Sequence, residues 1–143
     1  MMDVAGVIGA IGCSIGAAMG LRALFDPRWA GWLVRLRDDP NRLGGAGEFR
    51  GTYGGLFFFT HALGLATIVN GPLDLPIAVD GFLSVAGVGV LATCGLIWWG
   101  TAVGRLVSIF ADRSGLGFNW ASVGFEIVLG AMVLAPLIFP VFA

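Results

Sequence analysis

The sequence predicts an all-α fold: a bundle of four transmembrane helices, with a short amphipathic helix at the membrane interface between the first two. Hydrophobic residues make up 57% of the 143 residues, and the mean hydropathy is +0.91. Only 12% of the residues are charged, whereas a soluble domain averages about 25%. A soluble helical bundle would also need polar outer faces, which runs such as VAGVIGAIGCSIGAAMGL lack. These observations favour a single integral membrane domain over residues 1–143.

Four apolar stretches are long enough to cross a bilayer, which takes about 20 residues per helix. They cover about residues 4–25, 49–69, 82–109 and 118–139. The third is longer than a span needs, so we expect it to tilt or to project from the membrane. Pro136 and Pro140 should loosen the last turn of the fourth.

The connection between the first two spans contains the predicted interfacial helix, at about residues 27–37. Asp26 is suited to the N-cap and Pro27 to the first helical position. Apolar residues then recur at i, i+3, i+4 and i+7: Trp29, Trp32, Leu33 and Leu36. This pattern is typical of a helix that lies in the interface with its tryptophans at headgroup depth. We interpret Trp29 and Trp32 as anchors that set the depth of the chain; the alternative is a lid or a docking surface.

Charges in the connections predict the orientation. Six of the eight arginines flank or lie in the first connection, and Arg105 and Arg113 are at the third. The second connection carries Asp74 and Asp80 and no basic residue. By the positive-inside rule, the first and third connections are cytoplasmic and both termini are extracytoplasmic. The first helix lacks the basic n-region and cleavage site of a signal peptide, so we expect a multi-pass protein of a bacterial inner membrane.

Glycines recur at a spacing that suits helix contacts in lipid. Gly12, Gly16 and Gly20 follow one another every four residues in the first span, and Gly100 and Gly104 repeat the spacing in the third. Small residues at this spacing let helix backbones approach closely. We expect the glycines to pack helices of the same chain. A contact with another copy or another subunit is the alternative, for which the first span is the best candidate.

Charged and polar residues gather at the predicted cytoplasmic ends of the spans. Glu48 falls in the first turn of the second span, where its charge suits the helix dipole. Glu126 lies about 12 Å into the fourth span at 1.5 Å per residue, and Arg105 lies at a comparable depth in the third. An intramembrane carboxylate stays charged only when it is paired, so we predict a Glu126–Arg105 ion pair. The predicted polar cluster, which either staples the helices or binds a ligand, comprises Glu48, Arg50, Tyr53, Arg22, Arg105 and Glu126.

The segments GLRALFDP, EFRGTYGG and GRLVSIFADRSG, with a glutamate in the last span, resemble a known family. It is the small bacterial four-helix membrane family catalogued as domain of unknown function 4345, in the DoxX-like grouping. The resemblance covers nearly the whole chain. It implies the four-helix fold and the polar cluster, but the family has no settled activity and supplies no reaction. Its motif residues correspond here to Glu48, Arg50, Tyr53, Gly54, Gly55, Arg105 and Glu126.

Other chemistry has little support. His61 is the single histidine and lies beyond the middle of the second span. A neutral imidazole can be an axial metal ligand, but we favour a hydrogen bond across the bundle. Cys13 and Cys94 lie in mid-span and are interpreted as packing residues. The formal net charge is −1 and no block of basic residues occurs, so a nucleic-acid partner is excluded.

The sequence therefore favours a small non-enzymatic membrane protein. It would be an accessory subunit of a larger complex, or a binder of a lipid or quinone-like molecule. Its partners would be membrane lipids and other membrane subunits or itself. No cofactor is required by the sequence, although a bound quinone or lipid is compatible with it. The alternative is a quinone-linked redox or proton-handling enzyme that uses the carboxyl group of Glu126.

Overall fold

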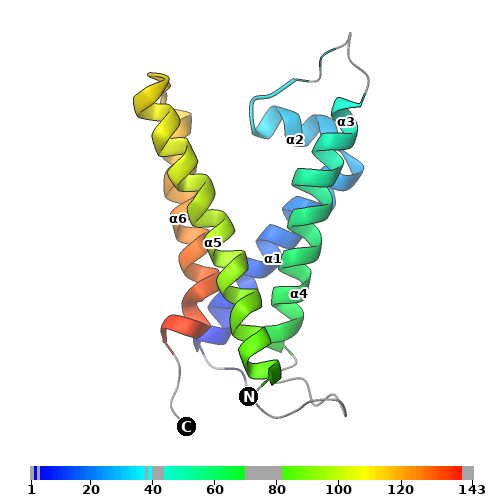
Figure 1. Cartoon of the computed structure of the whole chain (residues 1–143), viewed down its shortest axis with the longest axis vertical. Helices are drawn as coiled ribbons and strands as arrows, with labels where there is room; N and C mark the ends of the chain where they lie inside the picture. Colours follow the sequence, from blue (N-terminus) through cyan, green and yellow to red (C-terminus); the bar gives the residue numbers. More distant parts are fainter. Residues whose placement is uncertain (1, 3, 38, 40–43, 70–81, 140–143) are drawn as a thin grey trace. The chain divides into compact units, whose positions relative to one another are not determined.

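The computed structural model describes residues 2, 4–37, 39, 44–69 and 82–139 of the chain, and these residues form helices joined by short turns. In chain order the elements are α1 (Val4–Phe25), α2 (Pro27–Leu33), α3 (Gly45–Glu48), the π-helix η1 (Phe49–Leu56), α4 (Phe57–Val69), α5 (Phe82–Ala111) and α6 (Gly117–Ile138) (Figure 1). Within the described residues, four helices are long and apolar enough to cross a membrane: α1, the continuous helix Gly45–Val69, α5 and α6. The chain is an all-α, multi-pass membrane protein, as predicted.

The second span begins four residues earlier than expected. Gly44 has a φ of 111°, a conformation that glycine adopts without strain, and its carbonyl accepts from the backbone N–H groups of Gly47 and Glu48. Gly45 and Gly47 are thus helical, and Glu48 lies in the first turn as predicted. The next eight residues, FRGTYGGL, form η1, a π-helix that the sequence analysis did not predict.

The interfacial helix α2 begins as predicted. Asp26 is its N-cap, with a side-chain oxygen that accepts from the backbone N–H of Trp29 at 3.1 Å, and Pro27 is the first helical residue. The cap satisfies one of the N–H groups that a helix start leaves without a partner.

The end of α2 corrects the predicted boundary: the helix stops at Leu33 and not near residue 37. Arg35 adopts a left-handed φ of 59°. Its N–H donates to the carbonyl of Trp32 at 3.2 Å, and the N–H of Leu36 donates to the carbonyl of Gly31 at 2.8 Å. These two bonds form a Schellman motif, which terminates a helix by satisfying its last carbonyls. Leu36 therefore lies outside the helix and not on its apolar face.

The chain forms two compact units. One comprises Cys13–Leu63, and the other comprises Met1–Gly12 with Gly64–Ala143. The single-domain interpretation stays a prediction.

In the unit Cys13–Leu63, α1 and the second span pack through glycines. A Cβ atom built on Gly16 would overlap the ring of His61, and one built on Gly20 would lie 2.8 Å from the Cα of Phe58. From the other side, a Cβ on Gly54 would approach the backbone of α1 just as closely. The predicted packing role of Gly16 and Gly20 is confirmed, and this face of α1 is occupied by the same chain. An oligomer contact elsewhere on α1 stays a prediction.

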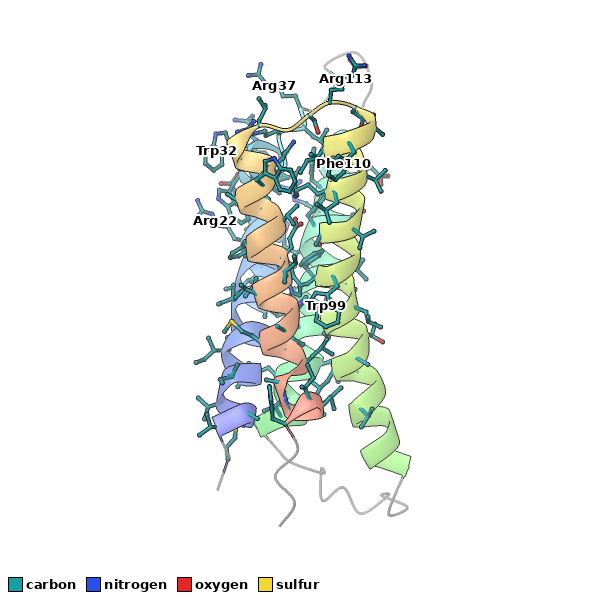
Figure 2. The ribbon with its side chains drawn as sticks, turned by 90° about the vertical axis from the view of Figure 1, so that its left-hand side faces the viewer. Arg22, Trp32, Arg37, Trp99, Phe110 and Arg113 are labelled. Atoms are coloured by element: carbon teal, nitrogen blue, oxygen red, sulfur yellow. The ribbon has the colours of Figure 1, made fainter. Side chains whose placement is uncertain are left out.

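In the other unit, α5 and α6 lie side by side, antiparallel, and pack through different glycines (Figure 1). A Cβ on Gly95 would overlap the side chain of Leu134, and one on Gly130 would overlap the indole of Trp99. Trp99 lies against α6 (Figure 2), where its Nε1 donates to the carbonyl of Ile127 at 3.2 Å. The backbones of α5 and α6 thus approach closely at these glycines, and one hydrogen bond joins the two helices.

Gly12 packs in this unit as predicted, with a built Cβ 3.1 Å from side-chain atoms of Met132 and Val133. Gly100 and Gly104 do not: within the described residues of their own unit, nothing lies within 4 Å of such an atom. The reason is helical phase. At about 100° per residue, Gly100 and Gly104 point about 140° and 180° away from Gly95, the glycine that contacts α6.

Candidate functional site

Arg105 and Glu126 form an ion pair between α5 and α6. The Nη2 of Arg105 donates to Oε1 of Glu126 at 2.7 Å, and its Nε donates to Oε1 at 3.0 Å and to Oε2 at 3.3 Å. Both carboxylate oxygens are therefore occupied by one guanidinium group. The side chain of Glu126 is 7% exposed and that of Arg105 is 25% exposed. The ion pair predicted from the depth of the two residues is present.

Helix periodicity explains why the two charges meet. Arg105 falls at the i+3 and i+4 spacing of the buried residues of α5, between Ala102 and Ile109. Glu126 falls in the same way between Val123 and Leu129 of α6. Each charge thus lies on the packed side of its helix, where the partner charge compensates for lost hydration.

Arg22 and Arg50 belong to the unit Cys13–Leu63, and each is held by a contact there. The Nε of Arg50 donates to the carbonyl of Leu24 at 2.9 Å. That carbonyl is in the last turn of α1, where helical carbonyls have no partner of their own. The guanidinium carbon of Arg22 lies 4.5 Å from the ring centroid of Trp29, a cation–π contact. Arg22 thus stacks on one of the two predicted interface anchors.

Glu48 and Tyr53 make fewer contacts. Glu48 is exposed and forms no ion pair with a described residue. The ring of Tyr53 is half-buried, with its centroid 5.7 Å from that of Phe49 one turn earlier. The six residues of the predicted polar cluster are thus divided between the two units, and their assembly into one ligand site stays a prediction. Of the two anchors, Trp32 is 75% exposed, whereas Trp29 is half-buried under Arg22.

A pocket of about 510 Å³ lies between α2, the turn that follows it and the start of the second span. We call it the arginine pocket. Its charged lining consists of arginines alone, and no described lining residue is acidic. The six lining side chains that matter for its chemistry are Arg28, Arg37 and Arg50, which are charged, and Trp32, Leu36 and Phe49, which are apolar. Figure 2 shows Trp32 and Arg37 at the same end of their unit.

Within the part of the chain that the structure describes, no acidic side chain neutralises the arginines of this pocket. Within the described residues, neither Arg28 nor Arg37 forms an ion pair, and Arg50 bonds only to a neutral carbonyl. The sequence analysis identified Arg50 and missed the other two. A signal was present: Arg28 and Trp32 are four residues apart, so they lie on one side of α2. Arg37 could not be assigned, because the predicted helix ran through it.

His61 is a packing residue. It is fully buried, its ring fills the space above Gly16, and its Nδ1–H donates to the carbonyl of Phe57 at 2.8 Å. The expected hydrogen bond across the bundle stays a prediction, because the bonds identified at Nδ1 are within α4. Within the described residues, no three of the residue types His, Cys, Asp and Glu are grouped so that they could hold a metal ion. Cys13 and Cys94 are buried thiols, consistent with packing.

Comparison with known proteins returns no relative: no family model, curated protein or solved structure matches this chain. The resemblance to the domain of unknown function 4345 family stays a prediction.

Proposed function

We propose that this membrane protein is a binding protein for an anionic amphipathic molecule, which it holds by its headgroup in the arginine pocket. The observation that carries the proposal is the lining: three arginines, three apolar side chains and no acidic residue among the described ones. Arg28, Arg37 and Arg50 are exposed and carry the same charge, and within the described residues no acidic side chain forms an ion pair with them. Their N–H groups are therefore available to an anion from outside, which arginine binds through charge-assisted hydrogen bonds.

The apolar side of the pocket argues for a lipid-like ligand over a small soluble anion. Trp32 and Leu36 are 75% and 53% exposed, and both belong to the amphipathic segment that follows the first span. Amphipathic helices with tryptophan lie at headgroup depth, where an acyl or prenyl chain can leave the pocket into the bilayer. The volume of about 510 Å³ is in the usual range for small-molecule sites, about 300–1,000 Å³.

The alternative function, quinone-linked proton or electron handling at Glu126, has less support. A proton-transferring carboxyl group must exchange its proton with a substrate. Both oxygens of Glu126 accept from Arg105, and the carboxylate is almost completely buried. This geometry favours a structural ion pair. An accessory role in a larger complex is compatible with lipid binding.

Lipid binding tests the proposal directly. The purified protein, the variant with both Arg28→Gln and Arg37→Gln, and the variant Arg113→Gln would be titrated with short-chain phosphatidylglycerol and phosphatidylcholine in detergent. We expect the protein to bind phosphatidylglycerol, and the double variant to lose about tenfold or more in affinity for it. Arg113 is the matched control, because it is exposed and outside the pocket. Equal affinities for both lipids, or equal losses in control and double variant, would contradict the proposal.

The proposed orientation puts the arginine pocket on the cytoplasmic side of a bacterial inner membrane, with both termini outside. It rests on the arginines of the first and third connections. Cytoplasmic leaflets that carry anionic lipids attract basic segments of this kind. An alkaline phosphatase fused after Ala143 should be active, and activity of a cytoplasmic reporter at the same position would reverse the orientation.

A further inference from the structure

We infer that the arginine pocket selects a terminal phosphomonoester headgroup, as in phosphatidic acid, over the phosphodiester headgroup of the common anionic lipids. The inference rests on the proposed function and adds the chemical class of the ligand. It follows from three features of the pocket: the number of arginines, the N–H groups that they have available to donate, and the lack of acidic residues in the described lining.

Charge favours a dianion. Three arginine residues line the pocket, with no acidic residue among its described lining. A phosphodiester carries a single negative charge and would leave two of the three cations uncompensated. A phosphomonoester carries about −1.5 to −2 charges at pH 7 and presents three strong acceptor oxygens. Its charge is therefore the closer match to the lining.

Hydrogen-bonding capacity favours the same group. The Nε–H of Arg50 donates to the carbonyl of Leu24. This bond fixes the guanidinium plane and leaves the two Nη groups of Arg50 to donate elsewhere. Arginine binds phosphate through two parallel N–H bonds, so each guanidinium can take a pair of oxygens. Arg28 and Arg37 form no bond or ion pair with another described residue. Three such forks can engage three terminal oxygens, which a phosphodiester does not have.

The same phosphate chemistry could come from a lipid or from a soluble phosphomonoester. We infer the lipid, because Trp32, Leu36 and Phe49 form the remaining wall and would contact the first carbon atoms beyond the phosphate. A soluble phosphate ester would leave this apolar surface without a partner.

The test compares ligands that differ in headgroup charge at equal total charge. The purified full chain in detergent would be titrated calorimetrically at pH 7.5 with dihexanoyl phosphatidic acid, with dihexanoyl phosphatidylglycerol at twice the concentration, and with glycerol 3-phosphate. We expect phosphatidic acid to bind about tenfold or more tightly than phosphatidylglycerol. Its advantage should shrink at pH 5, because the second pKa of a phosphomonoester is about 6. Glycerol 3-phosphate should bind much more weakly than the lipid.

Two variants separate selectivity from folding. Arg50→Lys keeps the charge but loses the planar fork, so it should reduce the preference for phosphatidic acid while Arg113→Gln leaves it unchanged. Since Arg50 also holds α1, the double variant Arg28→Gln, Arg37→Gln gives the second measurement. It should bind both lipids with equal affinity and unfold at the same temperature as the parent.

The outcomes distinguish the inference from the function on which it rests. Equal binding of phosphatidic acid and phosphatidylglycerol, with phosphatidylcholine unbound, would overturn the selectivity and leave the proposed function standing. Failure of both anionic lipids to bind would overturn both. Glycerol 3-phosphate binding as tightly as the lipid would overturn the assignment to a lipid.

Discussion

The ion pair of α5 and α6 should behave as a strongly coupled pair when each partner is replaced. The changes are Arg105→Met, Glu126→Leu and both together. Glu126 is 7% exposed and accepts three hydrogen bonds from Arg105, at 2.7, 3.0 and 3.3 Å. Removing one partner of a buried pair costs about 3–5 kcal/mol, and we expect Arg105→Met to lie in this range.

The second single variant should cost less. The Arg105 side chain is 25% exposed, and its long stem can carry an unpaired guanidinium toward the headgroups, so Glu126→Leu should cost about 1–3 kcal/mol. Replacing both charges by apolar side chains is often neutral or stabilising. The double variant should therefore be more stable than the sum of the single losses predicts, by about 3 kcal/mol or more.

Reversible unfolding in mixed micelles, with sodium dodecyl sulfate as the denaturant and circular dichroism as the signal, measures these differences. Arg113→Met is the control, since Arg113 is exposed, and it should change the free energy of unfolding by less than about 0.5 kcal/mol. Single losses that add to the double loss within about 0.5 kcal/mol would refute the coupling and the structural role of the pair.

Four further substitutions test helix packing, helix capping and one hydrogen bond between helices. Gly20→Ala pushes a methyl group against the backbone of the second span and should destabilise the protein by about 1–3 kcal/mol. Gly100→Ala places its methyl group where nothing in its own unit lies within contact, so it should be neutral or stabilising. Thermal unfolding compares the two variants, and equal effects would contradict the packing role of Gly20. Asp26→Ala removes the N-cap of α2 and should cost that helix about 1 kcal/mol, seen as faster amide exchange confined to its first turn. Trp99→Phe removes the indole N–H that donates to the Ile127 carbonyl, in addition to that carbonyl's own helical bond, and should cost about 0.5–1.5 kcal/mol in the same unfolding assay; no loss would contradict a stabilising role for this bond.

The fold was largely predictable because lipid imposes simple rules. A spanning segment must satisfy its own backbone and present apolar side chains, so length and hydropathy locate it. The predicted end of α1 agrees with the structure at Phe25, and the start of α5 agrees at Phe82. The starts and ends that depend on single backbone conformations were missed. Gly44 begins a helix and Arg35 ends one through positive φ angles, which composition does not reveal.

The site was predictable only where depth alone decided the partner. Glu126 needed a cation at its level and Arg105 was the available one, and the two are paired. The arginine pocket depends instead on the turn after α2, which brings Arg37 beside Arg28 and next to Arg50 from another helix. Arg37 and Arg50 follow Arg28 by 9 and 22 positions and lie outside its helix, so these spacings do not place them on the same helix face as Arg28. No pattern in the chain indicates that they meet.

By itself, the sequence determined that this chain crosses a membrane four times, has a capped short helix after the first span and pairs Glu126 with Arg105 between the last two spans. Each of these follows from hydrophobic length, local capping chemistry or the cost of an unpaired charge in lipid. The tertiary structure decided which glycines are contacts and which are surface, because Gly20 faces a neighbouring backbone while Gly100 is turned away from α6. It also decided which arginines share a pocket. Both depend on the rotation of each helix about its axis, and that rotation is set by packing between elements distant in the chain.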